Sequence, residues 1–206
     1  MLPPLRTVTV ILAALALAVC VASARADAPA PATYNSHGVT FSYPGTWIEL
    51  PVAYEIKIGT PLWVDTIGPP PQITPTNPPP ASGSQPPVTN PDVVTLSAAH
   101  INVVFTKKNI GRYKKYFAAS MAQIAASAHG QVESGPTRVT LGGLPGYAFR
   151  MTALSSTGLT VENRMVYLFK RKLEYFVNCA HPQNDPMTAE IESGCDQIMR
   201  SFRLTK

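Results

Sequence analysis

The chain has 206 residues, of which 14% are charged, and its formal net charge is +5 at pH 7. This length suits one domain with a single core. The charge density is far below that of a dedicated nucleic-acid binder, so the composition excludes nucleic acid as the expected partner.

Residues 1–26 have the parts of a cleavable signal peptide. A short segment with one positive charge, Arg6, precedes an uncharged run rich in Ala, Leu and Val at 8–24, and Ala24-Arg25-Ala26 is an A-x-A cleavage site. The run is shorter than the about 20 residues that a spanning helix needs. We therefore predict an exported protein, periplasmic or secreted, that begins at Asp27 and has no membrane span after cleavage.

The signal segment also contains a sequence that looks like a lipobox, Leu17-Ala18-Val19-Cys20. Such boxes have a small residue before the cysteine, whereas Val19 is branched. We expect Cys20 to be lost with the peptide and not to carry a lipid anchor.

The mature chain begins with an Ala/Pro-rich stretch and then a strand. Residues 27–33 read as a flexible leader. Val39, Phe41 and Tyr43 then alternate with polar residues, which is the period of a half-buried strand, and Pro44-Gly45 ends it in a turn.

A proline-rich segment follows at about 61–91, where eleven of 31 residues are proline. Proline removes the backbone donor that a helix or a central strand needs, so we predict a polyproline-like insertion there. The segment is either an insertion tolerated at a loop tip or a dedicated partner-binding segment, and we favour the first.

Strand and helix patterns alternate after this insertion. Residues 93–105 are strand-like, and 109–130 switch to helical spacing with Asn109 as the expected N-cap. Strands are predicted at 137–141, 147–153, 159–169 and 173–179, and a second helix at about 187–200 with Asp185 as its N-cap. The predicted fold class is α+β, an antiparallel sheet flanked by helices.

Two cysteines remain after cleavage, Cys179 at the end of the last predicted strand and Cys195 on the apolar side of the second helix. Disulfides persist in exported proteins, so an even pair predicts one bridge. The alternative is a metal site that adds His181 and Asp196, but the paired C-x-x-C spacing is lacking. We predict no metal and no cofactor.

Three short motifs resemble the PsbP-like family. Tyr34-Asn35-Ser36-His37-Gly38-Val39-Thr40-Phe41-Ser42-Tyr43-Pro44-Gly45-Thr46-Trp47 resembles its opening strand and Tyr-Pro-x-x-Trp corner, Gly143-Leu144-Pro145-Gly146-Tyr147-Ala148-Phe149 its Gly-x-Pro turn, and Ile198 to Leu204 its closing helix. The resemblance implies one α/β/α sandwich domain over 34–206, in extracytoplasmic proteins that mostly act as binding or assembly modules. The chain departs from the pattern in its proline-rich insertion and its expected disulfide, and no ligand-binding motif of the family matches.

Catalytic motifs are not found. There is no G-x-S-x-G, and the four histidines are scattered along the chain. The glycine-rich run Leu141-Gly142-Gly143-Leu144-Pro145-Gly146 lacks the Lys-Ser/Thr of a phosphate-binding P-loop and precedes a strand, so we interpret it as a tight turn. We expect no enzyme activity, and the alternative that stays open is an exported hydrolase with a non-obvious active site.

The feature that best suggests a function is a set of basic residues in two short stretches, one at the start of the first helix and one at the tip of the last hairpin. We call this set the basic rim: Lys107, Lys108, Arg112, Lys114, Lys115, Lys170, Arg171 and Lys172. It is either a solvated face or a contact site. We predict a monomeric, non-catalytic envelope module that uses the rim to contact an anionic surface, a small ligand or an acidic exported protein, provided that both stretches lie on one side of the fold.

Overall fold

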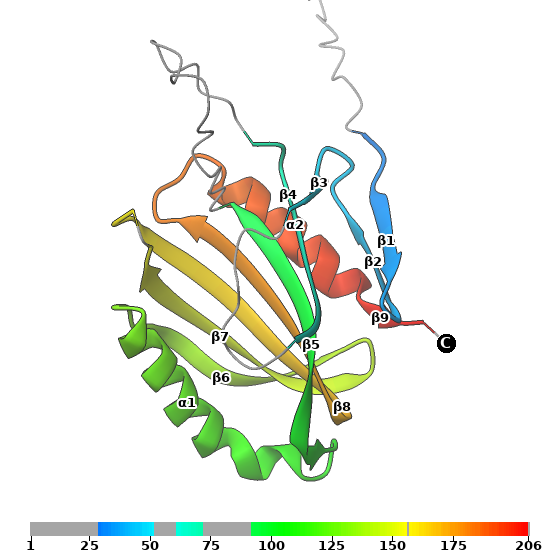
Figure 1. Cartoon of the computed structure of the whole chain (residues 1–206), viewed down its shortest axis with the longest axis vertical. Coiled ribbons are helices and arrows are strands. Elements are labelled where there is room, and N and C mark those ends of the chain that lie inside the picture. Colours follow the sequence, from blue (N-terminus) through cyan, green and yellow to red (C-terminus); the bar gives the residue numbers. More distant parts are fainter. Residues whose placement is uncertain (1–28, 52–60, 72–91, 156, 206) are drawn as a thin grey trace, which may run out of the picture.

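The computed structural model describes residues 29–51, 61–71, 92–155 and 157–205 as an α/β/α sandwich (Figure 1). A six-stranded antiparallel sheet has the order β3-β4-β5-β8-β7-β6, and a three-stranded sheet has the order β1-β2-β9. The predicted fold class is confirmed. Within these residues no helix is long and apolar enough to cross a membrane. The predicted signal peptide lies outside the described residues.

The elements have the following bounds. The small sheet contains β1 (Ala32–Ser36), β2 (Val39–Tyr43) and β9 (Arg203–Leu204). The large sheet contains β3 (Ile48–Leu50), β4 (Pro61–Gly68), β5 (Val93–Phe105), β6 (Val132–Leu141), β7 (Leu144–Leu154) and β8 (Thr160–Pro182). The helices are a 3-10 turn, η1 (Ile110–Tyr113), followed by α1 (Lys114–Ser127), and α2 (Thr188–Ser201).

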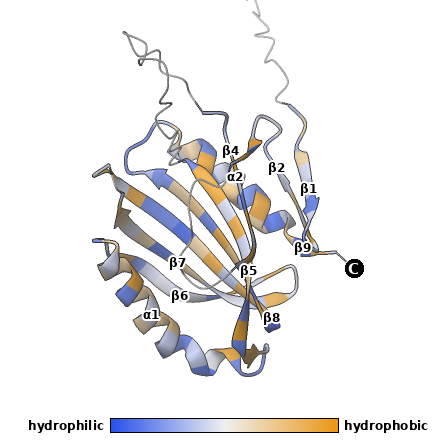
Figure 2. Ribbon diagram, in the orientation of Figure 1, coloured by the Kyte–Doolittle hydropathy of each residue, from blue (hydrophilic) through white to orange (hydrophobic). Residues whose placement is uncertain are grey.

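Alternating side chains of the large sheet belong to two separate hydrophobic cores, one on each face of the sheet. Val166 and Leu168 of β8 belong to the core under α2 and the small sheet, whereas Met165 and Phe169 belong to the core under α1. Successive residues of a strand point to opposite faces, so this division places the helices on opposite sides. Figure 2 shows both apolar and polar residues along the strands of the large sheet.

Strand β8 folds back on itself, as the predicted hairpin requires. The backbone N–H of Gln183 donates to the carbonyl of Thr160 at 2.9 Å, and the Asn178 amide donates to the Asn163 side chain at 3.0 Å. Arg171, in the predicted tip, has a φ of 58°. One arm pairs with β7 and the other with β5, and Figure 1 shows the two arms in yellow and orange.

Two predicted boundaries are wrong. The proline-rich insertion was expected from about 61, but Pro61–Gly68 is strand β4, paired with β5 and β3. Proline is tolerated as the first residue of a strand, and the β-prone residues after it were hidden by the proline content of the wider window. Residues 72–91 of the predicted insertion lie outside the described residues. The predicted leader at 27–33 is also too long, since β1 begins at Ala32.

Asn109 lies at the N-cap position of η1 as predicted, but its side chain makes no capping hydrogen bond, and the predicted cap Asp185 is wrong. The Asn109 side chain accepts the N–H of Thr106 at 2.7 Å and donates to the carbonyl of Val104, so it closes a turn before η1. Asp185 accepts the N–H of Met187 at 2.7 Å, and Met187 is the residue at the N-cap of α2. Asn and Asp favour such side-chain turns as readily as caps, which is why sequence alone does not separate the two.

Helix α2 is fixed to the sheet by a disulfide and by the aromatic corner of the small sheet. Cys179 of β8 and Cys195 of α2 form the predicted bridge, with Cα atoms 6.1 Å apart, so their sulfurs do not hold a metal. The Trp47 indole N–H donates to Glu190 at 3.0 Å. A Cβ at Gly194 would collide with the Trp47 ring, so only glycine allows the helix this close.

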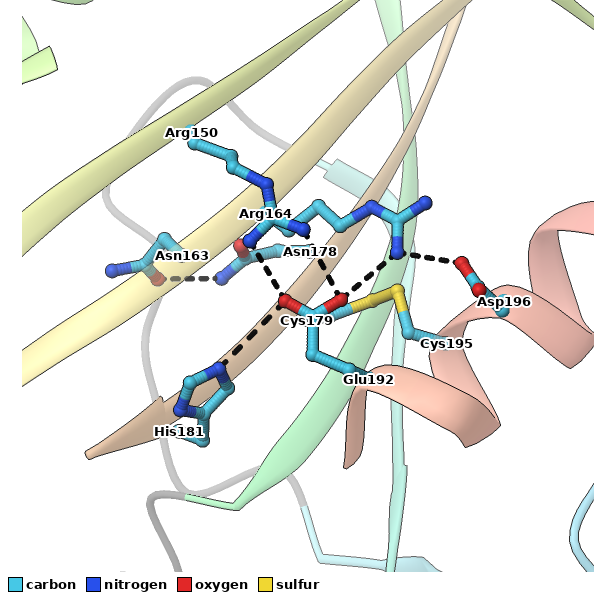
Figure 3. The surroundings of a disulfide bond; sticks show 9 residues. All are labelled: Arg150, Asn163, Arg164, Asn178, Cys179, His181, Glu192, Cys195 and Asp196. Atoms are coloured by element: carbon cyan, nitrogen blue, oxygen red, sulfur yellow. Dashed lines mark hydrogen bonds and ion pairs between the residues drawn. A yellow bond between two sulfur atoms is a disulfide. The ribbon is translucent and has the colours of Figure 1, made fainter. Parts of the chain in front are cut away.

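An ion-pair cluster lies beside the disulfide (Figure 3). Glu192 of α2 accepts hydrogen bonds from Arg150 at 2.8 Å and from Arg164 at 2.9 Å, and Arg164 also donates to Asp196 at 2.6 Å. Burial opposes the charge of Glu192, but the hydrogen bonds from the two arginines outweigh it and lower its pKa. The charges of Arg150 and Arg164 are therefore compensated within the fold.

We predict that removing the disulfide destabilises the domain without unfolding its sheet. The bridge joins residues 16 positions apart, and closing a loop of that size contributes about 3 kcal/mol in the chain-entropy model. Urea unfolding of a Cys179→Ala, Cys195→Ala variant measures this loss. A variant as stable as the wild type would contradict a structural role for the bridge.

We also predict an acid-sensitive contribution from Glu192. A carboxyl group whose pKa is lowered by folding stabilises above its unfolded pKa of about 4.3, and the contribution is lost as pH falls through the folded pKa. Glu192→Gln should cost about 1 to 2 kcal/mol at pH 7. Unfolding of both proteins over a pH series should show the difference shrinking in acid, and a difference that is constant with pH would contradict this account.

Candidate functional site: a basic end of the sandwich

The register of the large sheet brings the two stretches of the basic rim to one end of the molecule. Phe105, the last residue of β5, lies opposite Arg171 at the tip of β8. The connection from β5 to α1 carries Lys107, Lys108 and Arg112, so it begins beside that tip. Figure 1 shows the end of β5, the tip of β8 and the start of α1 together at the lower edge of the molecule. Both stretches of the basic rim therefore lie on one side of the fold, which was the condition on their acting together.

Aromatic side chains of the hydrophobic core pack against this end. The ring of Phe105 lies 4.4 Å from that of Phe169 and 4.8 Å from that of Tyr113, measured between centroids. The Tyr147 hydroxyl donates to the carbonyl of Ile110 at 2.9 Å. The connection that carries the lysines is therefore packed on a core, so the rim charges have a defined place in the fold.

All eight side chains of the basic rim are exposed. Within the described residues none of them takes part in an ion pair. As far as the described residues go, these side chains reach solvent and have no carboxylate partner.

Three further arginines that the sequence analysis did not single out join this end. The Arg138 guanidinium, on β6, donates to the carbonyl of Lys107 at 2.7 Å. Arg200 and Arg203, at the end of α2 and in β9, line a hollow together with Thr140 to Gly143. They lie far from the rim in sequence, so local charge density gives no signal for them. We call the basic rim together with Arg138, Arg200 and Arg203 the basic end.

Charge is strongly segregated along the long axis of the strands. The basic end holds eleven of the thirteen lysines and arginines in the described residues, and the other two are Arg150 and Arg164 of the ion-pair cluster. No described Asp or Glu falls within 105–115, 138–147, 168–172 or 199–205. Glu174 is two residues beyond the tip of β8, and burial raises its pKa to about 7, so it carries about half a charge at neutral pH.

The first turn of α1 has the charge that its macrodipole disfavours. The helix starts with Lys114 and Lys115, has no acidic residue in its first turn and has no side-chain cap at Tyr113. The N-terminus of a helix carries a partial positive charge, so each exposed cation there costs roughly 0.3 to 1 kcal/mol. The positive potential of this end is therefore higher than the lysines alone would produce.

His181, which lies near two carboxylates, is poorly suited to catalysis. His181 is buried, and its Nε2 lies 3.8 Å from Glu192 and 4.0 Å from Glu162. Its Nδ1 lies 3.0 Å from the carbonyl of Pro182 and 3.3 Å from the Thr188 hydroxyl. A carbonyl oxygen only accepts, so Nδ1 carries its proton toward Pro182 and does not take one from Thr188. This geometry gives the hydrolase alternative no activated nucleophile.

No family model matches the chain, and no curated protein matches it significantly. The solution structure of cyanobacterial PsbP (CyanoP) from Synechocystis sp. PCC 6803 is similar, with a TM-score of 0.53 and 14% identity over 84% of this chain and 92% of that one. The chain has a PsbP-like fold. This confirms the fold implied by the three motifs.

Two other solved structures match this PsbP-like domain at lower TM-scores. LpqN, involved in cell envelope biogenesis of Mycobacterium tuberculosis, has a TM-score of 0.46 and 13% identity over 86% of this chain and 90% of its own. A protein from Bacteroides thetaiotaomicron has a TM-score of 0.48 and 11% identity over 84% of this chain. The chain spans 48% of the length of that protein.

We predict that Lys115→Glu stabilises this PsbP-like domain by about 1 kcal/mol, because it replaces an unfavourable charge at a helix N-terminus with a favourable one. Urea unfolding at low ionic strength measures the gain. Lys108→Glu is the control, since it relieves the same crowding of positive charge outside the helix. Equal gains for the two variants would show that the helix dipole plays no part.

Proposed function

We propose that this chain is an extracytoplasmic, non-catalytic binding module that docks an extended anionic partner of the cell envelope through its basic end. The observation that carries the proposal is the segregation of charge: eleven exposed cations gather at one end, while the two other described arginines are paired with carboxylates of α2. The signal-like segment at 1–26 and the disulfide support a site of action outside the cytoplasm.

A merely solvated face is a poorer explanation of this arrangement. A surface can be solvated by charges of either sign, whereas this end gathers like charges from four segments that are distant in sequence. Gathering them opposes stability, through mutual repulsion and through the dipole of α1. An anionic partner relieves both costs when it binds.

The shape of the basic end favours an extended partner. Its cations come from the β5–α1 connection, the tip of β8, strand β6 and the end of α2, and they surround the end of the sandwich. A surface, a polymer or an acidic face of another exported protein contacts several of these segments at once. Such attraction acts over a Debye length of about 8 Å at physiological ionic strength, so it steers the partner and weakens with salt.

We predict that neutralising the start of α1 weakens binding to polyanions more than an equal change of net charge elsewhere. The test variant is Lys114→Gln, Lys115→Gln, and the control is Ala122→Glu, Gln123→Glu, which changes the net charge by the same amount farther along the same helix. Binding is measured with polyglutamate, and with vesicles of phosphatidylglycerol and phosphatidylcholine, over a series of salt concentrations.

The wild type and the control should bind with similar salt dependence, and the test variant should dissociate at lower salt. Preference for vesicles over polyglutamate indicates an anionic membrane as the partner, and the reverse preference indicates an acidic polymer or protein. Equal binding by test variant and control would show that only net charge matters. That result would overturn docking through the basic end.

A further inference from the structure

The hollow beside the end of α2 has the donors of a specific anion site. It has a volume of about 310 Å³ and is lined by Thr140, Leu141, Gly142, Gly143, Met199, Arg200 and Arg203. Arginine, threonine and backbone N–H groups supply the donors, and no carboxylate is part of the lining.

The β6–β7 turn is built to lie close to the end of α2. Gly142 and Gly143 have φ values of 55° and 80°, which residues with a side chain rarely adopt. A Cβ on Gly142 would lie 2.8 Å from the carbonyl oxygen of Phe202, so glycine permits this contact. Within the described residues neither glycine N–H donates to another backbone group. Both glycines line the hollow, so two N–H groups without a described backbone acceptor belong to its wall.

Arg203 is held in place by the carbonyl groups that end α2. Its Nη1 donates to the carbonyl of Phe202 at 2.6 Å and to that of Arg200 at 3.1 Å. These bonds compensate the negative end of the helix dipole, which would otherwise repel an anion. They also restrict the guanidinium while leaving its Nε and Nη2 donors for a ligand. Arg200, exposed on the last turn of α2, has no ion-pair partner in the described part of the chain.

We propose that this hollow binds a phosphate group carried on a molecule the size of a glycerol or sugar phosphate. Arginine presents paired donors that match phosphate oxygens, and a tetrahedral phosphate can accept from donors on several sides at once. The volume is larger than a bare phosphate needs and lies at the lower end of ligand sites, which are roughly 300 to 1,000 Å³. This inference deepens the proposed function, on which it rests, by naming the group that the basic end recognises individually.

The experiment follows the backbone amide signals of Gly142 and Gly143 by NMR in the full mature chain. Glycerol 3-phosphate, inorganic phosphate and uncharged glycerol are titrated at constant ionic strength. Vesicles of phosphatidylglycerol, with phosphatidylcholine vesicles as the control, test whether the same phosphate chemistry is read from a lipid headgroup. The variants are Arg200→Gln, Arg203→Gln and Arg200→Lys, and Gln123→Glu, exposed on α1 outside the basic end, is the control that changes the net charge by the same amount as Arg200→Gln.

Glycerol 3-phosphate should shift both glycine signals, and glycerol should not. Arg200→Gln and Arg203→Gln should each weaken binding about tenfold, since each removes a charged hydrogen bond, whereas Gln123→Glu should bind like the wild type. Arg200→Lys should bind more weakly than the wild type, because a lysine cannot form the bidentate pair.

Two outcomes would overturn the inference. One is saturation that is the same in Arg200→Gln as in the wild type, and the other is an absence of shifts at Gly142 and Gly143. Arg203→Gln also removes the hydrogen bonds to the end of α2. If Arg203→Gln fails to fold, Arg200→Gln decides the test, because it leaves those hydrogen bonds intact. If polyglutamate still binds through the basic rim in these cases, the phosphate site alone fails and the proposed function stands.

Discussion

The antiparallel register of β8 against β5 and β7 is the constraint on which the rest of the molecule depends. The strand folds back at Arg171, so its two arms pair with neighbours that run into α1 on one side and out of the β6–β7 turn on the other. Antiparallel strands place their connections at alternate ends. The β5–α1 connection, the tip of β8, the β6–β7 turn and the end of α2 therefore meet at one end.

The positive charge of that end follows from the positions of the acidic residues. Glu192 and Asp196 of α2 compensate Arg150 and Arg164 on the sheet, next to the disulfide that holds the helix. No comparable acid is present within the segments of the basic end that the structure describes. The ion pairs fix α2 at Glu192 and Asp196, whereas Arg200, in the last turn of the helix, and Arg203, just after it, have no ion-pair partner within the described residues.

Local patterns predicted the parts of this fold that depend on neighbours in sequence. The alternation in Val39, Phe41 and Tyr43 predicted strand β2, and the run Lys170 to Lys172 was correctly placed at the tip of β8. The signal-like segment indicated an exported protein, so the cysteine pair was expected to form a disulfide. Sequence could not predict the contribution of Arg203, because its place depends on a contact between the Gly142 turn and Phe202. It also missed β4, since a proline count does not register that Pro61 is the first residue of the strand, a position that tolerates proline.

We propose that an anionic partner contacts the basic end and no other surface. Backbone hydrogen exchange of the mature chain, with and without saturating polyglutamate or phosphatidylglycerol vesicles, tests this proposal without changing any residue. We expect added protection to be confined to the β5–α1 connection, the β6–β7 turn, the tip of β8 and the end of α2. Protection centred on the acidic half of α2, or spread evenly over the sandwich, would contradict it.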